Sequence, residues 1–187
     1  PDAAIQMDER LPRTEDEYTM TLLGALPLLA KPGAQTFANI GIGSGLTAEV
    51  VLSHSGPSAV HTIEIEPAMG TGSLAFHPRV DRLFRDRRVR VFFEDAKSYF
   101  ARHARRYDVI ISEPSNPWVN GVASLFTTEF YRETARHLAP GGLFVQWLHF
   151  YELDDRLLGS MFAALDANFG DYDVYEVSAG DLVVLAV

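Results

Sequence analysis

Two patterns of hydrophobic and polar positions alternate along this chain. Short runs rich in β-branched and aromatic residues are separated by longer stretches in which apolar residues recur at helical spacing. The short runs predict strands near residues 36–41, 59–65, 88–93, 107–112, 142–148, 172–177 and 181–187. The longer stretches predict helices near residues 45–54, 67–75, 96–104, 127–138 and 153–168. Strands that alternate with helices in this way are typical of a mostly parallel sheet covered by helices.

The connection between the last two predicted strands, residues 178–180, is too short for a helical crossover. Those two strands should therefore be antiparallel neighbours. The predicted sheet has seven strands, is mostly parallel, carries helices on both faces and ends in this antiparallel hairpin. That α/β arrangement resembles the Rossmann-like fold of class I methyltransferases. Before the sheet, Thr14 followed by acidic residues predicts the capped start of a helix that continues over residues 18–29.

Length and composition are those of one globular domain. The 187 residues are 47% hydrophobic, which is enough to fill a core. No repeat or linker interrupts them, so we expect a single domain over residues 1–187, in which residues 1–30 form an N-terminal segment and helix. The chain has no cysteine, which excludes disulfides and thiolate chemistry. The longest apolar run, residues 22–30, is shorter than the roughly 18 residues that a membrane span needs, so we expect no membrane insertion by this chain.

The net charge, the spacing of the histidines and the start of the chain bear on the expected binding partners and the expected cellular location. The formal net charge of −9 would repel a phosphate backbone, so we expect no nucleic-acid partner. The histidines show no spacing typical of metal ligands, so we expect no metal site. The chain starts at Pro1 with neither an initiator Met nor a signal sequence. This start indicates an excised piece of a longer protein rather than a signal-bearing precursor. We expect a cytoplasmic location, with the soluble domain of a larger membrane protein as the alternative.

A glycine-rich segment, residues 41–45, lies where the first predicted strand gives way to a helix. Gly41, Gly43 and Gly45 let the backbone bend tightly and approach a ligand, and the start of the following helix presents free N–H groups. Their spacing differs from the GxGxxG pattern that binds a dinucleotide pyrophosphate. A tight strand-to-helix turn without a ligand is the alternative interpretation of the same glycines.

Acidic residues stand at the ends of the next two predicted strands. Glu64 follows an apolar run about 20 residues beyond the glycines, where a carboxylate can accept both hydrogen bonds of a ribose diol. We interpret Glu66 as the cap of a helix that starts at Pro67. Asp95 can accept a hydrogen bond from an adenine amino group, or it can be only a helix N-cap. Because ligands of open α/β sheets bind at the carboxyl ends of the strands, the glycines and these acids together predict an adenosine-like ligand.

The fourth predicted strand ends in Glu113-Pro114-Ser115-Asn116-Pro117-Trp118, followed by Ser124-Leu125-Phe126 and a helix with Tyr131. This segment resembles the spermidine and spermine synthase family, in which the corresponding loop reads Asp-Ser-Ser-Asp-Pro and precedes Ser-Leu-Phe. The likeness extends in order over roughly residues 14–187 and includes residues 41–45, 63–66, 94–96, 138–142 and 146–147. The Glu-Pro-Ser-Asn-Pro-Trp form resembles a bacterial branch in which such a domain is often joined to membrane segments. The family's small N-terminal β domain has no counterpart in the sequence.

The resemblance implies a transferase of polyamine biosynthesis that uses S-adenosylmethionine or its decarboxylated form as donor. It assigns the methionine-like part of the donor to the three glycines, the ribose to Glu64, and the adenine to Asp95 with the Ala96 backbone. The family transfers an aminopropyl group to an amine such as putrescine, and acids of the fourth-strand loop help to deprotonate that amine. Glu113 takes this catalytic position here. On the acceptor side we assign Ser115, Asn116, Trp118 and Gln146.

The acceptor side departs from the family at several positions. Asn116 stands where the family has a second acid, and an amide cannot attract an ammonium group as a carboxylate does. Residues 19–21 read Thr-Met-Thr instead of Tyr-Gln-Glu, and the loop at residues 178–180 lacks the family's tyrosine. Trp118 can wall the acceptor pocket, with plain packing as the commoner role. His149 is a candidate acid or base, although a lone histidine beside aromatic residues more often makes a local hydrogen bond.

Three functions from different classes therefore stay open. An aminopropyltransferase is favoured by the order of the motifs along the chain and by Glu113. A methyltransferase is favoured by residues 116–118, which resemble the Asn-Pro-Pro-aromatic loop of N-methyltransferases. A non-catalytic nucleoside-binding domain of a larger membrane protein is favoured by the lost acceptor residues. We expect the first of these, with a small amine as partner, and the sequence leaves a homodimer open.

Overall fold

The computed structural model describes residues 5–114, 121–150 and 153–187, and its centre is a seven-stranded sheet of order β3-β2-β1-β4-β5-β7-β6. The strands are β1 Thr36–Ile40, β2 Ala59–Glu64, β3 Val89–Phe93, β4 Tyr107–Ser112, β5 Leu138–His149, β6 Tyr172–Ser178 and β7 Asp181–Ala186. Strands β1 to β5 pair in parallel, whereas β7 is antiparallel to both β5 and β6. The predicted sheet with its C-terminal antiparallel hairpin is confirmed.

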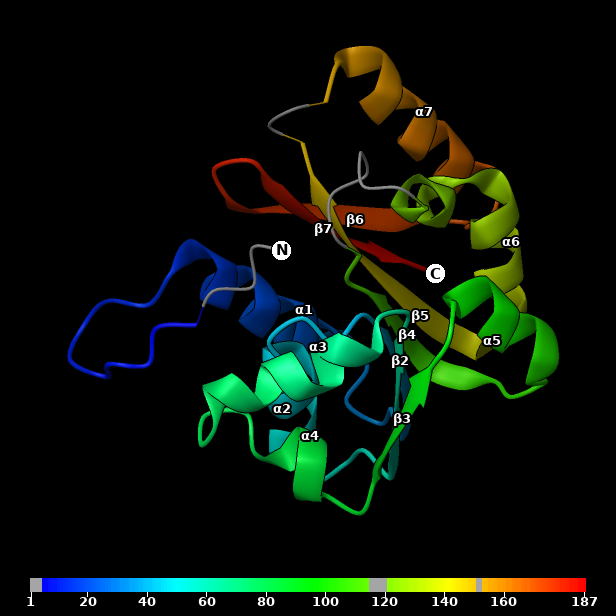
Figure 1. Cartoon of the computed structure of the whole chain (residues 1–187). Coiled ribbons are helices and arrows are strands. Elements are labelled where there is room, and N and C mark those ends of the chain that lie inside the picture. Colours follow the sequence, from blue (N-terminus) through cyan, green and yellow to red (C-terminus); the bar gives the residue numbers. More distant parts are fainter. Residues whose placement is uncertain (1–4, 115–120, 151–152) are drawn as a thin grey trace.

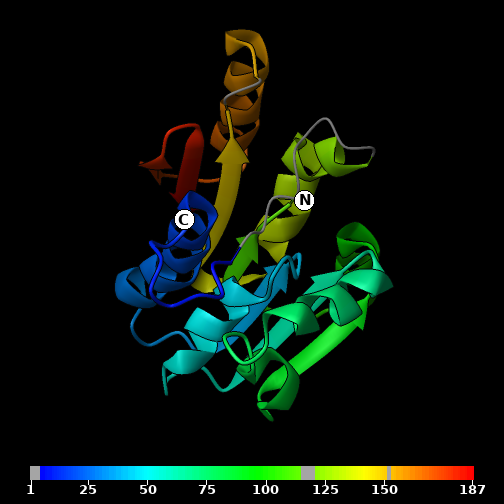
Figure 2. The ribbon, with the colours of Figure 1, turned by 60° about the vertical axis from the view of Figure 1, so that its left-hand side comes forward.

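Helices cover both faces of this sheet (Figure 1). They are α1 Glu15–Ala30, α2 Leu46–Ser53, α3 Pro67–Gly72, α4 Arg82–Arg85, α5 Ala96–Arg102, α6 Thr128–Arg136 and α7 Asp155–Asp166. Short 3-10 turns follow α3 at Ser73–Phe76 and precede α6 at Val122–Phe126. Seen from a second direction, α1 and α2 lie on one side of the strands and α6 and α7 on the other (Figure 2). Across the described ranges, none of these helices is both long and apolar enough to pass through a lipid bilayer.

Alternation along the strands explains why the core has two layers. Phe37, Val109 and Val145 on β1, β4 and β5 point to the layer shared with α1 and α2. Ile110 and Phe144, which are register partners, point to the opposite layer shared with α5, α6 and α7. Because successive side chains of a strand point to opposite faces, odd-numbered and even-numbered residues of β4 and β5 are sorted between the two layers. The same alternation determines which polar side chains at the strand ends lie on one face of the sheet and can contact one another.

The start of α1 follows the predicted cap. Thr14 accepts a hydrogen bond from the backbone N–H of Glu17 at 3.2 Å, and the Glu17 side chain accepts one from the backbone N–H of Thr14 at 3.0 Å. This reciprocal pair is a capping box, and it satisfies N–H groups that a helix start otherwise leaves without partners. Glu17 is buried and also pairs with Arg79 at 2.5 Å, so the cap anchors α1 to the segment that follows α3.

Element boundaries differ from the prediction mainly at two places. Strand β5 begins at Leu138 rather than near residue 142, because Leu138 already pairs with Tyr107 across a register shift. Residues 139–142 include a proline and two glycines, which are typical of turns, so the sequence pattern does not indicate a strand that starts at Leu138. The four-residue helix α4 was not predicted, since a segment this short carries too little periodicity to be recognised.

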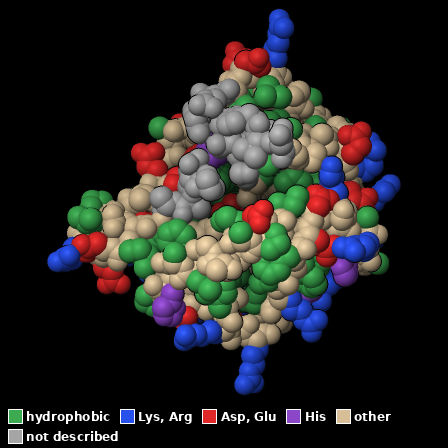
Figure 3. Space-filling view, in the orientation of Figure 1, with side chains coloured by type: hydrophobic (Ala, Val, Ile, Leu, Met, Phe, Trp, Pro, Cys, Tyr) green, Lys and Arg blue, Asp and Glu red, His purple; other side chains and the backbone are tan. Residues whose placement is uncertain are grey.

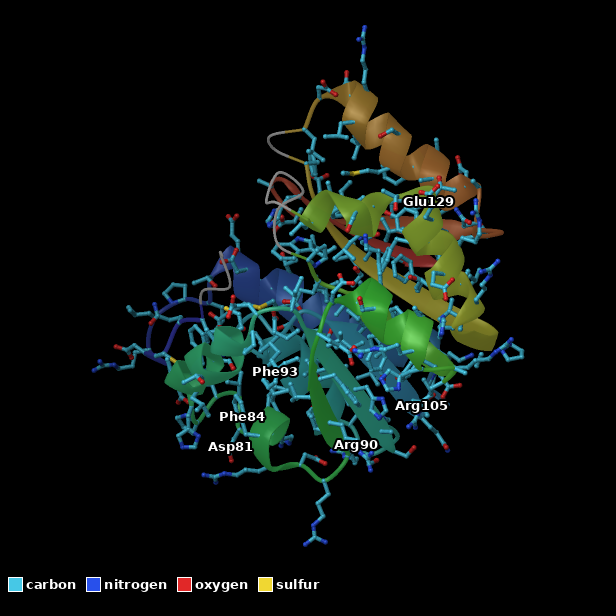
Figure 4. The ribbon with its side chains drawn as sticks, turned by 45° about the vertical axis from the view of Figure 1, so that its right-hand side comes forward. Asp81, Phe84, Arg90, Phe93, Arg105 and Glu129 are labelled. Atoms are coloured by element: carbon cyan, nitrogen blue, oxygen red, sulfur yellow. The ribbon has the colours of Figure 1, made fainter. Side chains whose placement is uncertain are left out.

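A buried polar cluster joins β2, α5 and β4 on the face opposite α1. His61 Nδ1 lies 3.0 Å from the Tyr99 hydroxyl and 2.9 Å from the Tyr107 hydroxyl. Burial, together with the positive charges of Arg105 and Arg90, which are labelled in Figure 4, lowers the pKa of His61 to about 4. The imidazole is therefore neutral in the folded protein at pH 7.

Acid should destabilise the fold through His61. The unfolded chain protonates this histidine near its ordinary pKa of 6.5, whereas the folded chain resists protonation down to about 4. Stability should therefore fall as pH drops through this window, by an amount on the order of 3 kcal/mol. His61→Gln removes the titrating group and should flatten this part of the profile. Urea unfolding of both proteins between about pH 7 and about pH 4 tests this expectation, and parallel profiles would contradict it.

Candidate functional site

The candidate site lies where the strand order reverses, between β1 and β4. In open α/β sheets such a switch point opens a crevice at the carboxyl ends of the strands. The glycine turn follows β1 and Glu113 follows β4, so both lie at this point. The backbone N–H of Glu113 donates to the carbonyl of Ile40 at 2.9 Å. Gly41 has a φ of 94°, and a Cβ at this residue would collide with the carbonyl oxygen of Glu113. Only glycine allows the turn and the end of β4 to approach this closely.

Glu64 is the last residue of β2 and is buried, with 7% of its surface exposed. One carboxylate oxygen accepts the backbone N–H of Ile42 at 2.8 Å, and the other accepts that of Glu66 at 2.8 Å. Glu64 thus holds the glycine turn against the end of β2. A carboxylate offers about four lone-pair sites, so these two bonds leave acceptor capacity for a ribose diol.

The two neighbouring acids act as helix caps. Glu66 accepts a hydrogen bond from the backbone N–H of Ala68 at 3.0 Å, which confirms its predicted role at the start of α3. Asp95 accepts from the backbone N–H of Ser98 at 2.9 Å, so the cap interpretation of Asp95 also holds. This bond occupies one oxygen, and recognition of adenine by Asp95 and the buried Ala96 stays a prediction.

Glu113 is the most strongly perturbed acid of the site. Its side chain is buried, and its Oε2 atom has no hydrogen-bond partner among the described residues. The pKa of Glu113 is raised to about 8, chiefly because the carboxyl group is buried; a hydrogen bond with Thr47 opposes this shift, and the negative charge of Glu64 adds to it. A carboxyl group in a dry crevice with an unused oxygen is poised to exchange a proton with a bound molecule.

The structure separates Gln146, the predicted acceptor residue that lies within the described ranges, from Glu113. Gln146 is fully buried and is the register partner of Ser112. Its Nε2 atom lies 3.4 Å from the carbonyl oxygen of Leu125, so it points to the face of the sheet that carries α6. Glu113 faces Thr47 of α2 on the opposite side. Acceptor binding by Gln146 stays a prediction, and Ser115, Asn116 and Trp118 lie outside the described residues.

Two exposed hydrophobic side chains near the ends of β2 and β3 were not predicted from the sequence. Ile65 and Phe93 follow Glu64 and precede Asp95 at the ends of β2 and β3, and they are 69% and 51% exposed. Figure 4 shows Phe93 at the end of β3, and Figure 3 shows hydrophobic side chains gathered on this face. A large exposed apolar residue beside an acid at a strand end is the signal that would have identified them.

A polar cluster lies at the end of β5 and the start of β7, and only its histidine, His149, was named from the sequence. Asp181 lies 2.5 Å from His149, and it accepts hydrogen bonds from Thr19 at 3.0 Å and Ser178 at 2.7 Å. His149 was a candidate on its own, but its acidic partner is distant in sequence. Within the described ranges, no group of three or more His, Asp or Glu side chains is arranged to hold a metal ion.

Comparison with known proteins gives a consistent family. The family model of the spermine/spermidine synthase domain matches residues 15–177. The polyamine aminopropyltransferase of Sodalis glossinidius is 32% identical over 146 residues, covering 77% of this chain and 49% of that protein. Polyamine aminopropyltransferase 1 of Aquifex aeolicus is 31% identical over 145 residues, covering 77% of this chain and 50% of that protein. The chain thus spans about half the length of these relatives.

Solved structures agree on the fold. A spermidine synthase in complex with the transition-state analogue AdoDATO superposes with a TM-score of 0.82 at 20% identity, covering 91% of this chain and 60% of that one. Human methyltransferase-like protein 13 in complex with SAH superposes with a TM-score of 0.71 at 21% identity, covering 92% of this chain and 80% of that one. The predicted class I methyltransferase fold is confirmed.

Glu113 should make stability depend on pH in the alkaline direction. The folded protein keeps a proton on Glu113 up to about pH 8, whereas the unfolded chain releases it near the ordinary value of 4.5. The stabilisation is complete below pH 4.5 and is lost as pH rises through about 8. Glu113→Gln cannot ionise, so between about pH 5 and about pH 9 it should gain on the order of a few kcal/mol relative to the unchanged protein. Urea unfolding at both pH values measures this gain.

The control for this measurement is Glu133→Gln on α6, where the carboxylate is half-exposed and pairs with Arg136. This variant should follow the pH profile of the unchanged protein. If Glu113→Gln follows it too, Glu113 is not the buried acid that the structure indicates.

Proposed function

Because the chain belongs to the spermine/spermidine synthase family, we propose that it transfers an aminopropyl group from decarboxylated S-adenosylmethionine to an amine such as putrescine. The observation that carries the proposal is Glu113, a buried carboxyl group beside Glu64 at the switch point of the sheet. The curated relatives described above are named polyamine aminopropyltransferases, which supports the same reaction. The family model covers residues 15–177, which include the glycine turn, Glu64 and Glu113.

The donor lies along the carboxyl edge of β1, β2 and β3 in this proposal. The backbone of the glycine turn contacts the part derived from methionine, and Glu64 accepts the ribose hydroxyls with its remaining lone pairs. Asp95 and the Ala96 backbone take the adenine edge, and the exposed side chains of Ile65 and Phe93 offer apolar surface to the base. Decarboxylated S-adenosylmethionine carries positive charge on its sulfonium and its amine, which matches the negative charge of Glu64 and favours ionisation of Glu113.

Glu113 acts as the general base of the proposed reaction. An amine whose pKa is near 10 enters as an ammonium ion at neutral pH and must lose a proton before it can attack. Ionised Glu113 takes this proton, and the freed lone pair attacks the aminopropyl carbon bonded to sulfur. A nitrogen–carbon bond forms, the carbon–sulfur bond breaks, and the electron pair goes to sulfur. The product 5′-methylthioadenosine therefore leaves without a formal charge on sulfur.

Glu64→Gln should weaken nucleoside binding. Glutamine keeps one acceptor oxygen for the backbone of the turn, but it loses the charge and the second acceptor that the ribose needs. A hydrogen bond to a charged group is worth roughly 1.5–3 kcal/mol, so affinity for 5′-methylthioadenosine should fall about tenfold to a hundredfold. Calorimetric titration measures this affinity. The matched control is Glu66→Gln, which changes the neighbouring helix cap and should bind as tightly as the unchanged protein. Equal affinity in both variants would refute the ribose assignment.

Glu113→Gln should abolish most of the transfer. Loss of a general base commonly costs about 10² to 10⁴ in rate. The assay measures release of 5′-methylthioadenosine from decarboxylated S-adenosylmethionine and putrescine. In the unchanged protein, kcat/KM should rise with pH toward about 8, because the base must be ionised, and Glu113→Gln should lack this rise.

The same assay distinguishes the alternatives, with Glu133→Gln as the control that keeps full activity. Methyl transfer from intact S-adenosylmethionine without aminopropyl transfer would favour a methyltransferase. Binding of 5′-methylthioadenosine in the calorimetric titration without transfer from either donor form would favour a non-catalytic nucleoside-binding domain.

A further inference from the structure

Two arginine side chains lie beside the buried cluster of His61, near the amino ends of the strands. Arg90 on β3 is the register partner of His61 on β2, so both side chains point to the same face of the sheet. Arg105 stands between α5 and β4, and its Nη1 atom lies 3.4 Å from Nε2 of His61. Both arginines are exposed, and Figure 4 labels them on this side of the molecule. The two guanidinium groups therefore flank one imidazole, which is only 5% exposed.

The protein does not compensate the charge of these two arginines. In the part of the chain that the structure describes, the ion pairs between arginine and Asp or Glu all involve other arginines. Glu94, the acid that follows β3, pairs with Arg102 and lies 3.7 Å from His103. The chain has 25 acidic residues against 16 basic ones, so a shortage of acids does not explain why Arg90 and Arg105 have none.

The same charges act on His61. Burial is the first cause of its lowered pKa, and the positive charges of Arg105, Arg90 and His103 are the others. The imidazole is therefore neutral and adds no positive charge of its own. Like charges that are held close together repel one another, and water weakens this repulsion without cancelling it. A bound anion would cancel it.

The hydrogen bonds of His61 determine which ring nitrogen carries the proton. The hydroxyl oxygens of Tyr99 and Tyr107 lie 3.0 and 2.9 Å from Nδ1, and 2.5 Å from each other. If Nδ1 accepts, one hydroxyl donates to Nδ1 and the other donates to the first hydroxyl, so both phenol protons are used. If Nδ1 carried the proton, one of these buried hydroxyls would have no acceptor within the cluster. The proton of neutral His61 is therefore on Nε2.

Nε2 of His61 and Nη1 of Arg105 are then two donors that face each other. A guanidinium group has no acceptor atom, and a protonated ring nitrogen has none either, so neither group satisfies the other across 3.4 Å. An acceptor atom beside both groups would receive a hydrogen bond from each. Water can fill this role, but only a negatively charged oxygen also offsets the two arginine charges.

We propose that Arg90, Arg105 and His61 form a binding site for a small phosphate-bearing anion. A phosphate group offers at least three strong acceptor oxygens, which match the donors of two guanidinium groups and one imidazole. A carboxylate offers two oxygens and one negative charge, so it compensates the two arginines less completely. Free phosphate and a phosphate monoester share the chemistry that this site recognises. The inference does not depend on the proposed function.

The proposed anion site is separate from the candidate nucleoside site. His61 lies three residues before Glu64 on β2, which corresponds to about 10 Å along an extended strand. The glycine turn and Glu113 follow the carboxyl ends of β1 and β4, at the opposite end of the strands from Arg90 and Arg105. A phosphate bound between the two arginines therefore does not occupy the position assigned to the donor.

The test is an NMR titration of the unchanged protein with inorganic phosphate, followed through the imidazole signals of His61 near neutral pH. These signals should shift and saturate with a Kd on the order of 1 mM, as expected for a few charge-assisted hydrogen bonds at an exposed site. Sodium chloride at the same ionic strength should leave them in place. No saturable shift with phosphate, or an equal shift with chloride, would overturn the proposal. A parallel titration with glycerol 3-phosphate identifies the source: equal or tighter binding assigns an organic phosphate, and weaker binding assigns the free ion.

Substitutions locate the site. Arg90→Gln and Arg105→Gln should each weaken phosphate binding about tenfold, because each removes a charged donor. Arg106→Gln is the matched control, since Arg106 is exposed, follows Arg105 directly and is not among the charges that act on His61. It should bind phosphate as tightly as the unchanged protein. Undiminished affinity in Arg90→Gln or Arg105→Gln would overturn the proposal, and the comparison of phosphate with chloride decides the question even if a variant does not fold.

Discussion

The close approach of the glycine turn to the end of β4 is the constraint on which the site depends. Gly41 leaves room for the carbonyl of Glu113, and the turn is held from the other side by Glu64. A side chain at Gly41 would push β1 and β4 apart at their carboxyl ends. Because the backbone lies this close, the buried carboxyl group of Glu113 lies near Glu64, whose negative charge raises the pKa of Glu113.

Helix α1 connects the glycine turn with the more distant strand β7. The carbonyl of Met20 accepts a hydrogen bond from Thr47, the residue that also contacts Glu113, and the Met20 sulfur accepts one from Ser44 of the glycine turn. The preceding residue, Thr19, reaches Asp181 on β7. Adjacent residues of one helix therefore contact both the region of the glycine turn and the start of β7. The segment that departs from the family's Tyr-Gln-Glu run, residues 19–21, connects these two regions.

The sequence was enough to predict what depends on local pattern. Alternating apolar residues placed the strands, the glycines placed the turn, and Thr14 and Glu66 were recognised as caps from their neighbours in the chain. Contacts between residues far apart in sequence could not be read in this way. Asp181 acquires its environment from Thr19 and His149, and Glu113 acquires its raised pKa from burial and from Glu64. Residue types and spacing marked Glu113 as a candidate, but only packing raises its pKa toward neutral pH.

The raised pKa of Glu113 has a consequence for the order of events in the proposed reaction. In the free protein near neutral pH, Glu113 holds a proton, because Glu64 supplies negative charge and water is excluded. A cationic donor placed beside both carboxyl groups favours the ionised form of Glu113, so donor binding and proton release are linked. The base becomes competent after the sulfonium has arrived, and the amine then meets a carboxylate rather than a carboxylic acid. In the proposed reaction, prior binding of the donor would therefore prepare Glu113 to accept the proton of the amine.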